Sequence, residues 1–154
     1  MAKIELVCIG KQKFKDLEPL EKEYEKKISF FAKFIITIIK PVKSGNEKTA
    51  MKAEGNKILE KIKDNDILIS LDRKGDILSS VEFSRFISNK LNYSDKNIVF
   101  AIGGPAGLSD DVLKNSAKVI SFSKMTFAHD IFKILFLEQL YRAFTIIKRT
   151  GYHR

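Results

Sequence analysis

The sequence predicts an α/β protein built on a parallel sheet, and three observations support that class. Short apolar runs alternate along the chain with longer segments of helical periodicity. Most connecting segments have about ten residues or more, which parallel neighbouring strands require. The fourth apolar run leads directly into a glycine-rich loop at Gly103. Ligands of parallel sheets bind beyond the carboxyl ends of the strands, so this loop is a candidate binding element.

Five apolar runs have the length of strands. They are residues 4–9, 32–39, 66–71, 97–102 and 118–122. Pro41 ends the second run and Gly103 ends the fourth, because neither residue favours the continuation of a strand. We expect all five strands to be covered by helices on both faces of the sheet.

The segments between these runs predict helices. They are residues 16–28, 45–63, 79–91, a short stretch after Ser109, and 128–148. Ser44 and Glu47 have the spacing of a capping box at the start of the second helix, and Ser79 or Ser80 starts the third. Ser109 is followed by two acidic residues, which are favourable at the positive end of a helix dipole. Gly151 is expected to end the last helix.

Length and composition indicate one globular domain over residues 1–154, without repeats or linkers. Cys8 is the only cysteine, which excludes a disulfide within the chain and a cysteine-based zinc site. The longest apolar run, residues 34–39, is far too short to span a membrane. The first ten residues are too short for a signal peptide, so we expect a cytoplasmic protein.

The formal net charge is +9. Residues 1–63 carry a net charge of +6, residues 64–101 carry −1, and residues 102–154 carry +4. Basic surface at both ends of the chain favours a nucleic-acid partner. A solvated, lysine-rich surface with no partner is the alternative, because Lys outnumbers Arg 23 to 5.

Three strand ends carry unusual residues and form a candidate pocket. The first is Leu71 with Asp72, the second is the glycine-rich loop 103–107, and the third is residues 123–127. Pro105 stands where a dinucleotide fingerprint needs its second glycine, and no Gly-Lys-Ser/Thr of a phosphate-binding loop is present. The glycine-rich loop is therefore either a tight turn or a backbone that approaches a flat ligand closely. Residues 121–127 either cap the next helix through Ser123 and Thr126 or contact the edge of a base.

The predicted helix over residues 128–148 is apolar nearly all round, which indicates burial on most sides. Either it is wholly a core helix, or one of its faces packs on a second subunit. Glu138 and Arg142 are four residues apart and can pair on one face, partly desolvated by their apolar neighbours. His129, Tyr152 and His153 are the remaining polar candidates; a lone histidine is more often structural than catalytic. No nucleophile elbow or zinc-protease motif is present.

Six segments together resemble the RlmH family along essentially the whole chain. They are KIELVCIG at 3–10, ISLDRKG at 69–75, IGGPAGL at 102–108, SFSKMTFAHD at 121–130, LEQLYRAF at 137–144 and YHR at 152–154. The resemblance implies a SPOUT-class methyltransferase that modifies N3 of a pseudouridine in 23S ribosomal RNA, with S-adenosylmethionine as methyl donor and no metal. It also implies a single-domain α/β SPOUT fold with a deep C-terminal trefoil knot, and a homodimer that acts on the ribosome.

The resemblance also assigns residues by position. Those that match the family's S-adenosylmethionine contacts are Leu71, Gly103, Phe122, Ser123, Lys124, Met125, Thr126 and Phe127. Those that match positions around the target base are His129, Glu138, Arg142, Tyr152 and His153. Ala128 and Lys133 depart from the family, which usually has proline and arginine there. The second departure questions a phosphate or carboxylate contact at Lys133, since lysine lacks the planar fork of arginine.

The implied reaction removes the proton of N3, for which His153 or His129 is the expected general base, with water or Glu138 as alternatives. Arg142 would stabilise negative charge on the ring carbonyls, and Tyr152 would stack on the base. The tail acts either within its own subunit or across a dimer. Two other functions remain open: a non-catalytic basic RNA-binding or ribosome-associated factor, and a flavodoxin-like or Rossmann-like nucleotide enzyme.

Overall fold

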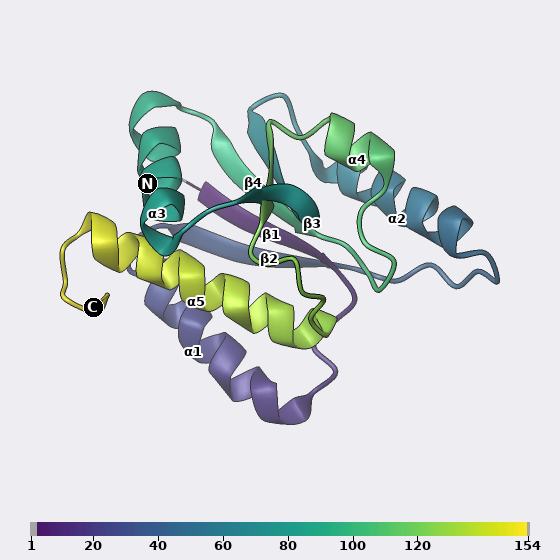
Figure 1. Cartoon of the computed structure of the whole chain (residues 1–154), viewed down its shortest axis with the longest axis horizontal. Helices are drawn as coiled ribbons and strands as arrows, with labels where there is room; N and C mark the ends of the chain where they lie inside the picture. Colours follow the sequence, from purple (N-terminus) through teal and green to yellow (C-terminus); the bar gives the residue numbers. More distant parts are fainter. Residues whose placement is uncertain (1–2, 154) are drawn as a thin grey trace.

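The structure, a computed structural model, describes residues 3–153 and contains every predicted strand and helix (Figure 1). Arg154, the last residue of the YHR segment, lies outside the described residues. The strands are β1 (Lys3–Ile9), β2 (Lys33–Ile39), β3 (Asp66–Ile77), β4 (Asn97–Ile102) and β5 (Lys118–Ser121). The helices are the 3-10 turn η1 (Lys15–Leu17), α1 (Glu18–Ser29), α2 (Glu47–Lys61), α3 (Ser80–Tyr93), α4 (Asp110–Lys114) and α5 (His129–Ile147).

The five strands form one sheet in the order β2-β1-β4-β3-β5, and every neighbouring pair is parallel. The predicted parallel α/β class is therefore confirmed. Because all strands run the same way, their carboxyl ends meet at one side of the sheet, which we call the carboxyl edge. The loops singled out in the sequence all lie at this edge.

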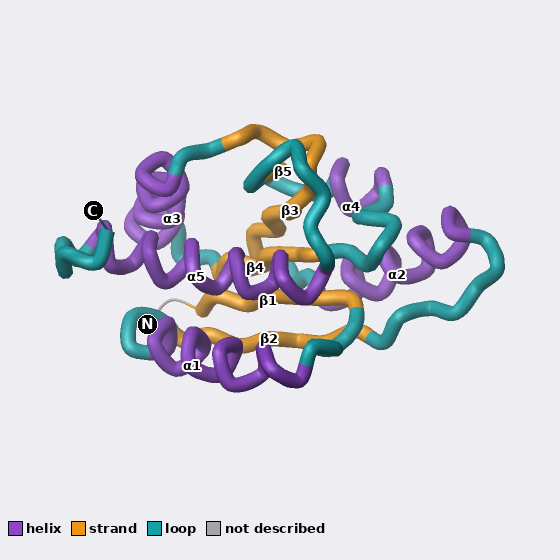
Figure 2. The backbone as a smooth tube through the Cα atoms, turned by 60° about the horizontal axis from the view of Figure 1, so that its bottom comes forward, coloured by secondary structure: helices purple, strands orange, loops and turns teal. Residues whose placement is uncertain are grey.

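Helices cover both faces of the sheet, with α1, α3 and α5 on one side and α2 and α4 on the other (Figure 2). Alternate residues of β1 face opposite layers, as strand geometry requires. Leu6 and Cys8 join the core beneath α1, α3 and α5, whereas Val7 and Ile9 join the core beneath α2 and α4. Burial raises the pKa of the Cys8 thiol to about 12, so this cysteine stays protonated and packs as an apolar group.

Two of the three predicted helix starts are confirmed. Ser79 caps α3, accepting a hydrogen bond from the Glu82 backbone N–H, while the Glu82 side chain accepts from the Ser79 backbone in return. Ser109 caps α4 through the Val112 backbone N–H. The capping box at Ser44 is wrong: Asn46 caps α2 by accepting from Thr49 N at 3.2 Å, and Ser44 only accepts from Asn46 N.

The end of α5 also differs from the prediction, because Arg149 rather than Gly151 takes the left-handed conformation that ends the helix, with φ of 54°. The amide of Arg149 donates to Ile146 O at 3.2 Å, and that of Thr150 donates to Thr145 O at 3.0 Å. This is the Schellman pattern, which satisfies the last helical carbonyls. Gly151 has φ of 80° two residues later and turns the tail back.

Strand β3 is six residues longer than predicted. Its pairing with β5 is interrupted after Leu71 and resumes at Asp76 and Ile77, so residues 72–75 bulge from the ladder. Gly75 fits there because a side chain would meet the backbone of Val119 at 2.6 Å. The bulge places charged residues at the carboxyl edge, next to the end of β4. None of the helices within residues 3–153 is long and apolar enough to cross a membrane.

Candidate functional site

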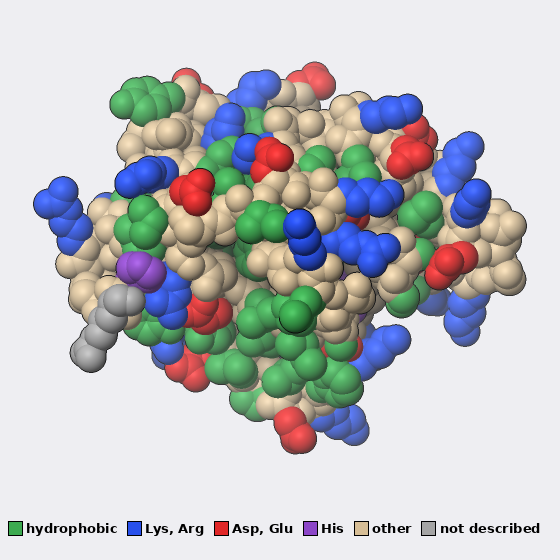
Figure 3. Space-filling model, in the orientation of Figure 1, with side chains coloured by type: hydrophobic (Ala, Val, Ile, Leu, Met, Phe, Trp, Pro, Cys, Tyr) green, Lys and Arg blue, Asp and Glu red, His purple; other side chains and the backbone are tan. Residues whose placement is uncertain are grey.

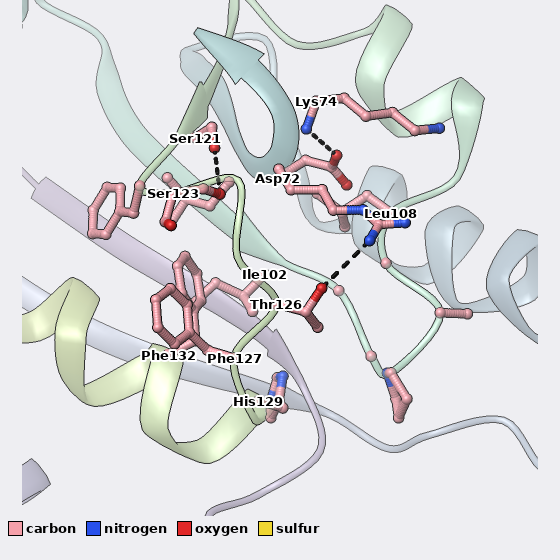
Figure 4. A pocket seen from close by; sticks show the side chains of 18 of the residues that line it. Asp72, Lys74, Ile102, Leu108, Ser121, Ser123, Thr126, Phe127, His129 and Phe132 are labelled. Atoms are coloured by element: carbon pink, nitrogen blue, oxygen red, sulfur yellow. Dashed lines mark hydrogen bonds between the residues drawn. The ribbon is translucent and has the colours of Figure 1, made fainter. Parts of the chain in front are cut away.

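A cavity of about 330 Å³ opens at the carboxyl edge, between the ends of β3, β4 and β5 (Figure 4). All three predicted loops line it. Its wall consists of residues 71–74 at the bulge of β3, residues 102–108 from the end of β4 onward, and Ser121, Phe122, Ser123, Met125, Thr126 and Phe127 from the end of β5 onward. Met51 of α2, Asp110 of α4, and His129 and Phe132 of α5 complete the lining.

The glycine-rich loop is both a tight turn and a cavity wall. The Gly107 amide donates to Gly104 O at 2.9 Å, and Gly107 has φ of 86°, which favours glycine. A Cβ on Gly103 would lie 2.5 Å from the carbonyl carbon and oxygen of Gly107. Glycine at 103 therefore keeps the two ends of the loop in close backbone contact.

The loop after β5 is held by its own polar groups. The Ser121 hydroxyl donates to Ser123 O at 2.9 Å, and Ser123 Oγ accepts from Met125 N at 3.0 Å. Thr126 Oγ1 accepts from Arg73 Nη1 at 3.4 Å, which links this loop to the bulge of β3. Ala128 is the N-cap of α5 and makes no side-chain cap, so the alternative in which Ser123 or Thr126 caps this helix is wrong.

Aromatic rings back this loop on the side of the core. Phe122 packs on Phe132 with ring centres 5.5 Å apart, and Phe127 stacks on Phe132 at 6.4 Å with an interplanar angle of 17°. Phe122 also meets Phe83 edge-on at 5.6 Å. These contacts give the cavity an apolar aromatic wall opposite the glycine-rich loop, an arrangement that suits a flat ligand with polar edges.

His129 is the first residue of α5 and lines the cavity. Its Nε2 is shielded from solvent and makes no hydrogen bond, the only such side-chain atom found within residues 3–153. Burial lowers the pKa of His129, opposed by Asp130 and by backbone groups of Gly103 and Gly10, so the ring is neutral at neutral pH. A neutral, incompletely bonded imidazole in a cavity wall is available as an acceptor.

Lys133 faces the core and not the cavity. Its Nζ lies 2.7 Å from Glu21 Oε1, and the two side chains are 2% and 14% exposed. Gln12 Nε2 donates to Glu21 Oε2 and to Asp130 O, each at 3.4 Å, and Lys13 N donates to Asp130 Oδ1 at 3.0 Å. The ion pair and these hydrogen bonds therefore hold α1 and the loop after β1 against the start of α5, next to His129.

The other four polar candidates form one group, which we call the tail cluster: Glu138, Arg142, Tyr152 and His153. Glu138 Oε1 accepts from Arg142 Nη2 at 2.6 Å and from the Tyr152 hydroxyl at 3.2 Å. Arg142 Nη1 lies 3.2 Å from His153 Nδ1, and its guanidinium lies 4.9 Å from the centre of the Tyr152 ring. Burial and a hydrogen bond with Tyr24 raise the pKa of Tyr152 to about 12, which keeps its hydroxyl protonated as a donor.

The structure thus divides the predicted residues between two places. All of the residues matched to cofactor contacts except Lys124 line the cavity, and so does His129. The tail cluster does not line it. Glu138 follows His129 by nine positions, or roughly 14 Å along the helix axis. The predicted pairing of Glu138 with Arg142 is confirmed, with side chains 20% and 24% exposed.

Five residues of the cavity wall were not among the predicted site residues: Met51, Arg73, Lys74, Asp110 and Phe132. The two basic residues directly follow the predicted third strand, so their place at a strand end was a usable signal. The others come from helices that pack beside the cavity, and no sequence pattern marks them. No group of three or more His, Cys, Asp or Glu residues that could hold a metal ion occurs in the described part of the chain.

Known proteins of similar sequence identify the class of protein to which this chain belongs. The family described as "Predicted SPOUT methyltransferase" matches residues 2–153. The chain is also 47% identical over 153 residues to the ribosomal RNA large subunit methyltransferase H of Flavobacterium psychrophilum, covering 97% of this chain and 98% of that protein. The protein of the same name from Clostridium botulinum is 42% identical over 157 residues, covering 98% and 99%. The chain belongs to the SPOUT methyltransferases and, within them, to the RlmH family.

Proposed function

We propose that this protein transfers a methyl group from S-adenosylmethionine to N3 of a pseudouridine in 23S ribosomal RNA, on the cytoplasmic ribosome. The observation that carries the proposal is the cavity at the carboxyl edge, built from three loops that include a tight glycine turn, and from an aromatic wall. The relatives' name, ribosomal RNA large subunit methyltransferase H, supports the substrate class.

The cavity fits the cofactor in size and chemistry. A volume of about 330 Å³ lies within the range of small-molecule sites. The residues that would hold S-adenosylmethionine are Leu71, Gly103 and the run 122–127, which includes Lys124. Gly103 keeps the turn closed and in its observed shape, since any side chain there would meet Gly107. When bound, the cofactor supplies an electrophilic methyl group, and the protein supplies alignment and exclusion of water.

His129 is our choice for the group that accepts the N3 proton. Burial keeps the ring neutral, and the ring belongs to the wall of the cavity. His153 is less suited in the arrangement observed, because its Nδ1 already faces Arg142 Nη1 at 3.2 Å. Arg142 would stabilise charge on the ring carbonyls and Tyr152 would stack on the base, provided that the tail cluster reaches a cavity.

We propose that the tail cluster reaches the cavity of a second copy. Ile131, Leu135, Glu138 and Arg142 form one stripe on α5, and the two aliphatic side chains are 44% and 37% exposed. Figure 3 shows an apolar patch over the first half of this helix. If the stripe packs antiparallel on its own copy about a twofold axis, Arg142 of each subunit lies opposite Ile131 of the other, beside the partner's cavity.

A second, smaller cavity supports this direction of packing. It has a volume of about 230 Å³, shares Phe122 and Phe127 with the first cavity, and is also lined by Leu135 and Gln139 of α5. The apolar surface therefore extends from the first cavity along the helix toward the tail cluster. A second copy that covers this surface would bury the exposed aliphatic side chains and close the cavity at the same time.

The C-terminal trefoil knot is part of the same proposal, as is the single domain over residues 1–154. The close passage of the β3 bulge against β5 supports it, because Gly75 lies against the backbone of Val119 and Ile120. The loops after β4 and β5 also meet at one cavity. Such threading is otherwise rare in proteins.

The decisive experiment is mass spectrometry of 23S ribosomal RNA from cells with and without this gene. We expect one methylated pseudouridine to disappear when the gene is deleted and to return with the wild-type gene but not with a chain lacking residues 152–154. Calorimetry with S-adenosylmethionine tests the non-catalytic alternative, because a folded protein that does not bind the cofactor contradicts the proposed activity.

A further inference from the structure

Basic side chains gather at the carboxyl edge of the sheet. The β3 bulge and the loops after the other strands carry seven basic residues and one acidic residue, a net charge of +6. These segments are residues 10–14, 40–46, 72–75, 103–109 and 122–128. At the opposite edge, the segments that lead into β2 to β5 carry two basic and two acidic residues, and so no net charge. Those segments are residues 30–32, 62–65, 94–96 and 115–117.

The seven basic side chains at the carboxyl edge are all exposed, and none makes an ion pair with a carboxylate of residues 3–153. They are Lys11, Lys13, Lys40, Lys43, Arg73, Lys74 and Lys124. Asp72, the one acid among them, accepts a hydrogen bond from the Lys74 backbone N–H at 2.9 Å. Lys3 and Lys118, the first residues of β1 and β5, pair with Glu5 and Asp76 at 2.9 and 3.1 Å, whereas Lys63 and Lys96 at the opposite edge make no ion pair with the described residues.

The strand order places these charges on both sides of the cavity. Residues 10–14 and 40–46 follow β1 and β2, on one side of β4, whereas residues 72–75 and 122–128 belong to β3 and β5 on the other side. Between them lies the uncharged glycine-rich loop 103–109. Figure 3 shows several Lys and Arg side chains near the middle of the molecule, with fewer acidic side chains beside them.

We propose that the carboxyl edge binds the phosphate backbone of RNA on both sides of the nucleotide whose base enters the cavity. The proposal rests on the proposed function and locates its RNA surface. Unpaired, exposed lysines neutralise phosphates by releasing condensed counterions, without reading sequence. An uncharged glycine-rich loop between two groups of basic side chains lets the sugar-phosphate chain cross the edge while one base turns into the cavity. Lys40 and Lys43 lie outside the cavity lining, so they report on RNA binding separately from cofactor binding.

The test compares two double variants with equal changes in net charge. Lys40→Glu/Lys43→Glu reverses two cations of the carboxyl edge, and Lys63→Glu/Lys96→Glu reverses two exposed lysines of the opposite edge. The probes are large ribosomal subunits from cells that lack this gene, and protein-free large-subunit RNA. We expect the first variant to bind both probes about tenfold more weakly at moderate salt, with a salt slope smaller by about 2. Its affinity for S-adenosylmethionine and its kcat at saturating subunits should match the wild type.

The control variant should differ from the wild type by less than about twofold in RNA affinity. Equal weakening of both variants would overturn the proposal, because the effect would then follow net charge and not the edge. Weakening on subunits but not on protein-free RNA would also overturn it, because the partner of the edge would then be a ribosomal protein. If the wild type binds RNA through this edge but methylates nothing, the proposed function is contradicted, whereas the proposed RNA-binding surface is supported.

Discussion

At the residue scale, His129 combines a cavity position with an incompletely bonded ring. A histidine in a core normally finds partners for both nitrogens, since an unsatisfied buried polar atom costs about 1–3 kcal/mol. Here Nε2 has none among the described residues. Such a cost persists where the group serves another purpose, and the position of the ring in the cavity wall agrees with contact to a ligand.

The lowered pKa of His129 makes a prediction for stability against pH. The unfolded chain binds a proton at this histidine more readily than the folded chain, so its contribution to folding is present above about pH 6.5 and is lost as pH falls toward the folded pKa. We expect His129→Gln to flatten the fall in unfolding free energy between about pH 7 and pH 5. Urea unfolding of both proteins at the two pH values measures it; parallel curves would contradict a buried neutral histidine.

Gly103 makes a second prediction at this scale. In Gly103→Ala, the new Cβ would meet the Gly107 carbonyl at 2.5 Å, and the loop must open into the cavity. We expect cofactor affinity, measured by calorimetry, to fall by about tenfold or more, equivalent to about 1.4 kcal/mol. Gly45→Ala is the control, because nothing lies within 4 Å of its Cβ. Unchanged affinity in Gly103→Ala would remove this turn from the cofactor site.

At the scale of elements, α5 holds the site in place through polar contacts as well as through its apolar face. The buried pair of Lys133 and Glu21 connects α5 to α1, and Gln12 extends the contact to the loop after β1. The departure from the family's usual arginine at 133 thus changes an internal ion pair and leaves the cavity wall intact. The departure at Ala128 is also accommodated, because its φ of −56° suits proline and alanine alike.

This ion pair predicts a strongly asymmetric response to mutation. Lys133→Met leaves the Glu21 carboxylate, 14% exposed, without its cation and should lower the free energy of unfolding by about 3 kcal/mol. The double variant Lys133→Met/Glu21→Leu should recover most of that loss, because an apolar pair replaces both charges. Urea unfolding of the wild type, both single variants and the double variant gives the coupling. A loss below about 1 kcal/mol in Lys133→Met would show that solvent already screens the pair.

At the scale of the whole molecule, the cavity and the tail cluster of one chain lie at different positions along α5. The tail is nevertheless ordered, because Tyr152 packs edge-on against Tyr141 at 4.9 Å and bonds to Glu138. A fixed tail that points away from its own cavity agrees with action on a second copy. In the dimer that we propose, the exposed Ile131 and Leu135 of α5 belong to the surface that the second copy covers.

A mixing experiment distinguishes action across the dimer from action within one chain. A chain lacking residues 152–154 has an unchanged cavity lining, and Gly103→Ala has an unchanged tail cluster. If the tail acts across the dimer, co-expression of these two impaired chains should raise methylation at low cofactor concentration above that of either variant alone, because each heterodimer has one complete site. Activity assays on tag-selected heterodimers measure it, with each variant alone as control. No recovery in a stable heterodimer would contradict action across the dimer.

The sequence predicted the elements well where local chemistry dominates. Continuous apolar runs marked the five strands, and Ser79 and Ser109 marked two helix starts. The sequence-based predictions failed where contacts with other residues decide where an element begins or ends. Asn46 displaced Ser44 as the cap of α2, Arg149 displaced Gly151 at the end of α5, and β3 continued through a bulge because β5 offered it a second stretch of pairing.

By itself, the sequence determined the parallel sheet, the three loops at strand ends and the basic character of the chain, because periodicity, glycine spacing and charge are local properties. Only the tertiary structure decided how these parts meet. It separated the tail cluster from the cavity, turned Lys133 inward onto Glu21, and brought seven exposed basic side chains to one edge. The physical reason is that a parallel sheet brings all strand ends to one side, which joins residues that lie far apart in the chain.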